Sequence, residues 1–141
     1  MITETLVCMA LNIYHEARSE SRIAQLAVGQ VVMNRVYSNK YPNDVCDVIY
    51  QAQLDTRGNP RKYSCAFSWY CDYKSDTPKD LKAYEEAMNN ATIVMNGWTG
   101  SYLEGATHYH ATYVLPRWAE HMTKVTQIDE HIFYRDDSHV K

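Results

Sequence analysis

The stretch Tyr14-His15-Glu16-Ala17-Arg18 ends the first helix that the sequence predicts, and it places one carboxyl group at that end. Thr3 is a suitable N-cap immediately before Glu4. Apolar residues recur between these ends at helical spacing, at Leu6, Ala10, Ile13, Tyr14 and Ala17. One face of the helix should therefore pack inward and carry Glu16 to the edge of the core.

Glu16 is a candidate general acid because of this setting. Nearby apolar surface disfavours the charged form of a carboxyl group, which raises its pKa towards the range where it can protonate a leaving oxygen. The alternative is a solvated side chain, or one half of an ion pair with Arg18. The local residues alone leave both interpretations open.

Segments along nearly the whole chain, taken in order, resemble the SleB-like cell-wall hydrolases, the spore-cortex-lytic enzyme family. These segments are residues 11–18, 25–36, 41–43, 45–51, 67–69 and 106–110, then Pro116, Trp118 and residues 131–134. The sequence departs from the family pattern at Ser19 and Ala24, where glycines are usual, and at Ala66, where a Gln often precedes the Phe. None of these departures affects Glu16.

The resemblance implies one α+β domain over residues 1–141, predominantly helical and lysozyme-like, with a small β element. It also implies a lytic transglycosylase that needs no cofactor and acts on peptidoglycan glycan strands. Glu16 would protonate the bond between N-acetylmuramic acid and N-acetylglucosamine. As a carboxylate it would then accept the proton of the muramoyl C6 hydroxyl, giving a 1,6-anhydromuramoyl end. The candidate substrate-binding residues are Ser68, Trp69, His108, Tyr109 and His110.

Glycosidases of the ordinary kind use a second carboxylate as nucleophile or base. The other acids considered are Asp47, Asp55, Asp72 and Asp76, and each is interpreted as a cap or a solvated turn residue. This interpretation leaves Glu16 as the single catalytic acid and base.

Two other functions stay open. His108 and His110 alternate, so on a strand both would point to one face. With His15 or His131 they would suit a zinc-dependent amidase that cuts between muramic acid and the stem peptide. A noncatalytic glycan-binding module would also use aromatic side chains, but it gives no reason for the position of Glu16.

Composition agrees with a small catalytic domain. The chain has 141 residues, of which 45% are hydrophobic, and these numbers suit one domain. A net charge of -3, without a run of Lys or Arg, argues against nucleic-acid binding. Twelve Tyr and three Trp are compatible with sugar binding. We expect a monomer.

The setting expected from the sequence is that of a phage endolysin acting on a Gram-negative host. No secretion signal and no apolar stretch long enough for a membrane span are recognised. Such an enzyme would be made in the host cytoplasm and would act on peptidoglycan in the periplasm or cell wall. Among the cysteines, Cys8 is expected to be a core thiol, and a bridge between Cys65 and Cys71 is left open.

Helical signals dominate the rest of the chain. A second helix is predicted from Glu20 or Ser21 to Tyr37, burying one stripe against the first. Two more helices are predicted, one from an Asn43 cap to Tyr50 and one from a Thr77 cap to residues 96–97. The core positions expected for the last helix are Leu81, Tyr84, Ala87, Met88, Ala91 and Met95. Residues 52–64 are predicted to form a loop, and residues 107–111 and 131–135 to be extended.

Overall fold

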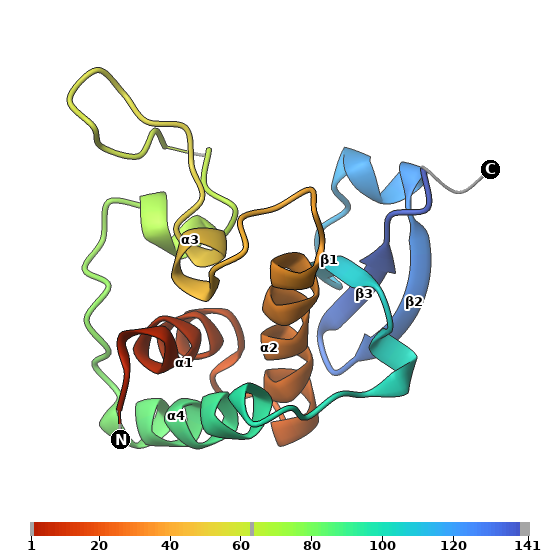
Figure 1. The fold of residues 1–141 in the computed structure, drawn as a ribbon, viewed down its shortest axis with the longest axis horizontal. Helices are drawn as coiled ribbons and strands as arrows, with labels where there is room; N and C mark the ends of the chain where they lie inside the picture. Colours follow the sequence, from red (N-terminus) through yellow and green to blue (C-terminus); the bar gives the residue numbers. More distant parts are fainter. Residues whose placement is uncertain (1, 63, 139–141) are drawn as a thin grey trace.

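The part of the chain that the structure describes contains four α-helices and a three-stranded antiparallel sheet (Figure 1). The structure is a computed structural model and describes residues 2–62 and 64–138. The helices are α1 (Glu4–Ala17), α2 (Arg22–Tyr37), α3 (Val45–Ile49) and α4 (Leu81–Met95), with short 3-10 helices η1 (Ser68–Cys71), η2 (Ser101–Leu103) and η3 (Arg117–His121). The strands are β1 (Ala106–Ala111), β2 (Thr123–Ile128) and β3 (His131–Arg135). The predicted α+β fold, predominantly helical with a small β element, is confirmed.

Helix α1 forms as its sequence predicts. The Thr3 hydroxyl accepts a hydrogen bond from the Leu6 amide at 3.2 Å, which satisfies one of the free N–H groups at the helix start. Ile13 and Tyr14 are fully buried on its inner face, where α1 packs mainly against α4. The helix ends at Ala17 because Arg18 adopts an extended conformation.

Helix α2 runs through the middle of the molecule, with the other helices on one side and the sheet on the other (Figure 1). The prediction that it buries a single stripe is wrong, because every residue from Ala24 to Val32 is buried. Its polar side chains in this stretch have internal partners. Gln25 accepts a hydrogen bond from Asn90 at 2.8 Å, and Gln30 accepts one from the Gly100 amide at 2.7 Å. Residues on opposite sides of α2 therefore enter two different parts of the core.

Gly29 lets α2 approach α4 closely. A Cβ at this position would lie 2.8 Å from Val94 Cγ2, a branched and buried side chain with little freedom to move. We expect Gly29→Ala to lower the free energy of unfolding by roughly 1–2 kcal/mol, since overpacking outweighs the gain of about 1 kcal/mol in helix propensity. Urea denaturation measures this change. Adding Val94→Ala should restore part of the loss, and strictly additive effects of the two substitutions would contradict the proposed clash.

Two helix starts differ from their predictions. The cap of α3 is Asp44 instead of Asn43, and Asp44 Oδ2 accepts the Asp47 amide at 3.1 Å. The cap of α4 is Asp80 instead of Thr77, with the Ala83 amide bonded to Asp80 Oδ1 at 3.0 Å. Because α4 starts later than expected, its first residue Leu81 is 75% exposed and does not belong to the core.

The sheet has the strand order β1-β3-β2, and all its pairs are antiparallel. The two predicted extended segments correspond to β1 and β3, whereas β2 was not predicted. Its sequence, Thr-Lys-Val-Thr-Gln-Ile, is mostly polar and lies at a sheet edge, where one face and one side meet solvent. In the loop over residues 52–64, whose residue 63 lies outside the described part, Leu54 pairs with Pro60.

Two disulfides connect the cysteines, Cys8 to Cys46 and Cys65 to Cys71. The prediction of a core thiol at Cys8 is therefore wrong in its chemistry, although the residue is buried. The first bridge joins α1 to α3. The second links Cys65 to Cys71, the last residue of η1. No described helix is long and apolar enough to cross a lipid bilayer.

Candidate active site

Glu16 lies in the last turn of α1, half-buried, facing strand β1. The chain turns sharply after it, and Ser19 has a φ of 73°, the left-handed region that favours glycine. Ser19 is one of the positions where the resemblance leads us to expect Gly. A left-handed backbone conformation at this position explains the expected Gly, and the turn leaves Glu16 near the end of the helix.

Tyr109 on β1 is the direct partner of Glu16. Its hydroxyl donates a hydrogen bond to Glu16 Oε1 at 2.5 Å, and its ring packs beside Phe133 at the centre of the sheet. Burial raises the pKa of Glu16 above its ordinary value of 4.5, although the bond from Tyr109 and the charge of Arg35 act in the opposite direction. Burial and the neighbouring carboxyl group raise the pKa of Tyr109 well above its usual value. Tyr109 therefore stays a hydrogen-bond donor, and Glu16 holds its proton to a higher pH than a solvated Glu.

Arg35 supplies a positive charge that acts on Glu16. Its Nε donates to the Thr107 carbonyl at 2.8 Å, and its guanidinium lies over the rings of Tyr41 and Phe67. Burial lowers the pKa of Arg35 below its usual value. This hydrogen bond holds Arg35 against β1, the strand that carries Tyr109.

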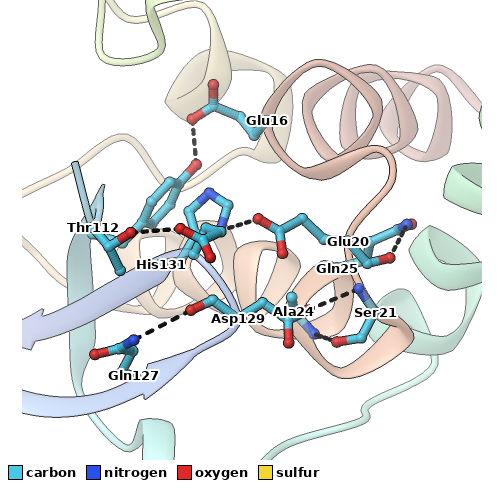
Figure 2. Close-up of polar contacts among 11 residues, drawn as sticks. Glu16, Glu20, Ser21, Ala24, Gln25, Thr112, Gln127, Asp129 and His131 are labelled. Carbon is cyan, nitrogen blue, oxygen red and sulfur yellow. Dashed lines mark hydrogen bonds and ion pairs between the residues drawn. The ribbon is translucent and has the colours of Figure 1, made fainter. Parts of the chain in front are cut away.

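A polar cluster fastens the connection between α1 and α2 to the turn between β2 and β3 and to the start of β3 (Figure 2). His131 Nδ1 lies 3.2 Å from Glu20 Oε1, and Asp129 Oδ2 accepts the Ser21 amide at 2.9 Å. Burial lowers the pKa of His131, whose ring lies 5.3 Å from the ring of Tyr109. These contacts hold the sheet against the helix end, so the Glu16–Tyr109 pair has a fixed geometry.

Tyr109→Phe should test this pair. In the wild-type protein the hydrogen bond from Tyr109 lowers the pKa of Glu16. Removing this bond should therefore raise the pKa of Glu16 further and move the alkaline limb of the pH–rate profile to higher pH. The value of kcat/KM should fall by about 10- to 100-fold, as for the loss of a hydrogen bond to a charged group. Profiles of kcat/KM against pH for both proteins measure the two effects. Tyr113→Phe, at a position that is 83% exposed, serves as the control, and an unmoved alkaline limb in Tyr109→Phe would refute the coupling.

Glu16 opens on a cleft of about 480 Å³ between the end of α1 and the segment over residues 68–79. Its lining includes Glu16, Ser68 and Trp69, so the structure brings these three predicted site residues together. Trp69 is largely buried. Its Nε1 donates to Asn12 Oδ1 at 2.8 Å, and its ring stacks on His15 at 4.6 Å. Trp69 therefore supports the wall of the cleft, while Ser68 lies at its surface.

His108 and His110 do not lie with this group. As predicted they share a face of β1, but it is the face opposite Tyr109, and both contact Trp118. His110 also shares a hydrogen bond of 2.8 Å with the Tyr134 hydroxyl. Burial lowers the pKa of His108 to about 4, so this side chain is neutral at physiological pH.

The ligands required by the zinc-amidase interpretation are not assembled. His15 stacks on Trp69, and His131 pairs with Glu20 on the other face of the sheet from His108 and His110. Within residues 2–62 and 64–138, no three His, Cys, Asp or Glu residues lie close enough together to hold a metal ion.

The far wall of the cleft was not predicted. It includes Asp72, Lys74, Asp76 and Lys79, between Cys71 and the start of α4. Asp72 Oδ1 accepts the Lys74 amide at 2.9 Å, which agrees with its predicted role in a turn. Asp76 is half-buried and lines the cleft, and burial raises the pKa of its carboxyl group. The alternation of charges over residues 72–79 was the available signal in the sequence, but only the fold shows that it faces Glu16.

Comparisons with known proteins agree with this architecture. The family model described as Cell Wall Hydrolase matches residues 19–134, a range that starts just after Glu16. The spore cortex-lytic enzyme of Bacillus cereus is 28% identical over 127 residues, which are 89% of this chain and 42% of that relative. The chain thus spans less than half of the length of the curated relatives that it matches.

Two solved structures share the fold. The catalytic domain of the germination-specific lytic transglycosylase SleB from Bacillus anthracis has a TM-score of 0.68 and 26% identity, covering 95% of this chain and 97% of that one. The catalytic domain of the Bacillus cereus SleB protein has a TM-score of 0.65 and 24% identity, covering 96% and 93% of the two chains. The chain therefore belongs to the cell wall hydrolase family and is an enzyme with the fold of a SleB catalytic domain.

Proposed function

We propose that this enzyme degrades peptidoglycan as a lytic transglycosylase, cleaving the bond between N-acetylmuramic acid and N-acetylglucosamine with Glu16 as its acid and base. The observation that carries the proposal is the half-buried Glu16 carboxyl group with a raised pKa, bonded to Tyr109 and open to the cleft. The similarity to a catalytic domain described as a lytic transglycosylase supports the choice of reaction.

In the first step, Glu16 transfers its proton to the glycosidic oxygen as the bond to muramoyl C1 breaks. Tyr109 is bonded to Oε1, so we assign the proton to Oε2, the oxygen left free for the substrate. The Glu16 carboxylate that forms is stabilised by the Tyr109 hydroxyl and by the charge of Arg35, the two influences that lower its pKa. The site therefore accommodates both protonation states of one carboxyl group.

In the second step, the Glu16 carboxylate takes the proton of the muramoyl C6 hydroxyl while the oxygen of that hydroxyl bonds to C1. This step restores the acid and consumes no water. The nucleophile is part of the substrate and lies close to C1, so no second carboxylate is needed to activate water or to attack C1. Ser68 at the cleft surface is proposed to hydrogen-bond an acetamido or hydroxyl group of the sugar.

Mass spectrometry of digestion products tests the reaction type. We expect muropeptides that end in 1,6-anhydromuramic acid, lighter by one water than hydrolysed products. Reducing muramic acid ends would instead indicate hydrolysis and would direct attention to Asp76, the second carboxylate of the cleft. Stem peptides released from uncut strands would favour the amidase, and intact walls would favour a binding module. Wall incubated without enzyme is the blank.

The phage-lysis setting, the route from host cytoplasm to wall and the monomeric state stay predictions. Fractionation of producing cells before and after lysis would test the route, and sedimentation velocity would test the state of assembly.

A further inference from the structure

Three positively charged side chains line the cleft beside Glu16. Arg18, Lys74 and Lys79 line it, and we call these three residues the cationic wall. Two carboxylates, Asp72 and Asp76, line the same cleft, so the positive charges exceed the negative ones when Glu16 holds its proton. The whole chain has a net charge of -3, and general basicity therefore does not account for the three cations.

The backbone of this wall is fixed to the end of α1. The Tyr14 hydroxyl accepts the amides of Lys79 and Asp80 at 3.2 and 3.1 Å. His15 Nε2 bonds to the Asp76 carbonyl at 2.9 Å, which ties the middle of the segment to the residue beside Glu16. The Arg18 guanidinium lies 4.8 Å from the centre of the Tyr14 ring. The supports of the cationic wall are therefore in place before any substrate binds.

None of the three cations has an acidic partner within the described ranges. The ion pairs found there join Lys40 to Asp136 and Arg135 to Asp137, and His131 contacts Glu20; none of these residues lines this cleft. Arg18, Lys74 and Lys79 are all exposed. Cations that are gathered on a pre-formed surface and are not engaged in ion pairs favour an anionic ligand.

The chemistry of peptidoglycan identifies that ligand. The sugar rings of the strand are neutral, and the carboxylates of the polymer belong to the stem peptides attached to the lactyl group of the muramoyl residue. Glu16 is proposed to act on the glycosidic bond of that same sugar, so covalent attachment brings the stem peptide close to the cleft. Asp72 and Asp76 suit a peptide that carries an ammonium group as well.

We infer that the cationic wall is a subsite for stem-peptide carboxylates, which makes peptide-bearing strands with free carboxylates the preferred substrate. The inference rests on the proposed glycosidic cleavage. Arg is suited to hold a carboxylate by two parallel hydrogen bonds, and Lys provides mobile point charges. By binding the stem peptide, the subsite would hold the glycosidic bond of the muramoyl residue beside the Glu16 carboxyl group.

Matched polymers test the subsite. One is soluble peptide-bearing glycan with free carboxylates, and the other is the same material with those carboxylates converted to amides. We expect kcat/KM to be roughly 10-fold higher on the free carboxylates at low salt, the combined effect of several exposed charge pairs. The ratio should shrink as salt is added. Equal rates on the two polymers would overturn the inference.

Charge variants assign the preference to these residues. The combination Arg18→Gln, Lys74→Gln and Lys79→Gln should bring the ratio to about 1. The matched control is Lys82→Gln, Arg117→Gln and Lys124→Gln, which removes three exposed cations that do not line this cleft and should keep the ratio. A wall variant that keeps the wild-type ratio, with a normal circular dichroism spectrum, would refute the assignment.

The readout separates this inference from the proposed function. The assay measures total glycosidic cleavage, whatever ends are produced. Reducing ends in place of anhydro ends would contradict the transglycosylase reaction, but the preference for free carboxylates over amides could still be measured. A failure to cleave either polymer would contradict both.

Discussion

Glu16→Gln should lower the rate of wall lysis by about 10²- to 10⁴-fold, the usual contribution of a positioned general acid. The amide keeps the size of the side chain and can still accept the hydrogen bond from Tyr109, but it has no proton to transfer at the pH of the reaction. Loss of turbidity of purified walls measures the rate. Glu85→Gln, an exposed change on α4, is the matched control and should keep full activity.

A stability measurement shows whether the variant is folded and also tests the environment of Glu16. Burial raises the pKa of this carboxyl group, so the folded state disfavours its charged form. Wild-type stability should therefore decline relative to Glu16→Gln as the pH rises above the ordinary value of 4.5, and the two proteins should converge below it. We expect a higher Tm for the variant at neutral pH. A folded variant that retains more than a few per cent of the lytic rate would exclude Glu16 as the acid.

Opening the Cys8–Cys46 disulfide should cost about 4 kcal/mol of unfolding free energy. The bridge spans 38 residues, and this figure is the loss of chain entropy in the unfolded state for a loop of that size. Denaturant titration of the Cys65→Ala/Cys71→Ala protein, oxidised and then reduced, isolates the effect, because both forms keep the sulfur atoms at positions 8 and 46. The Tm should fall by more than 10 °C on reduction, given the unfolding entropy usual for this chain length.

The companion bridge provides the comparison. Cys65 and Cys71 are only 6 positions apart in the sequence, so the same model assigns this link about 2 kcal/mol. The protein with Cys8→Ala and Cys46→Ala should therefore respond less to reduction. Equal responses of the two bridges would show that loop size does not govern their contributions.

Local signals were sufficient for the parts of the fold that depend on neighbouring residues. The cap at Thr3, the apolar spacing of α1 and the end of α4 at Asn96 are decided within a few residues of sequence. The start of α4 is different. The Tyr14 hydroxyl, distant in sequence, accepts the Lys79 and Asp80 amides, and Asp80 becomes the cap in place of Thr77.

The site was predictable to a similar extent. The position of Glu16 at a helix end follows from periodicity, and the choice of Tyr109 came from the resemblance. Alternation along β1 indicates that His108 and His110 share a face, but it does not say which face meets α1. That choice depends on packing of the sheet against α2, which places Phe133 in the core and Tyr109 beside it.

The strand order β1-β3-β2 also determines when, during synthesis, the sheet beside Glu16 can form. The central strand β3 follows both of its neighbours along the chain, so during synthesis β1 and β2 emerge from the ribosome before their common partner exists. Glu16 is made before Tyr109, which lies 93 residues further on and has no paired strand until β3 appears. Non-local pairing of this kind is slow, and domains generally fold as units. A nascent chain would therefore carry its acid without the partner that orients it until β3 has been made.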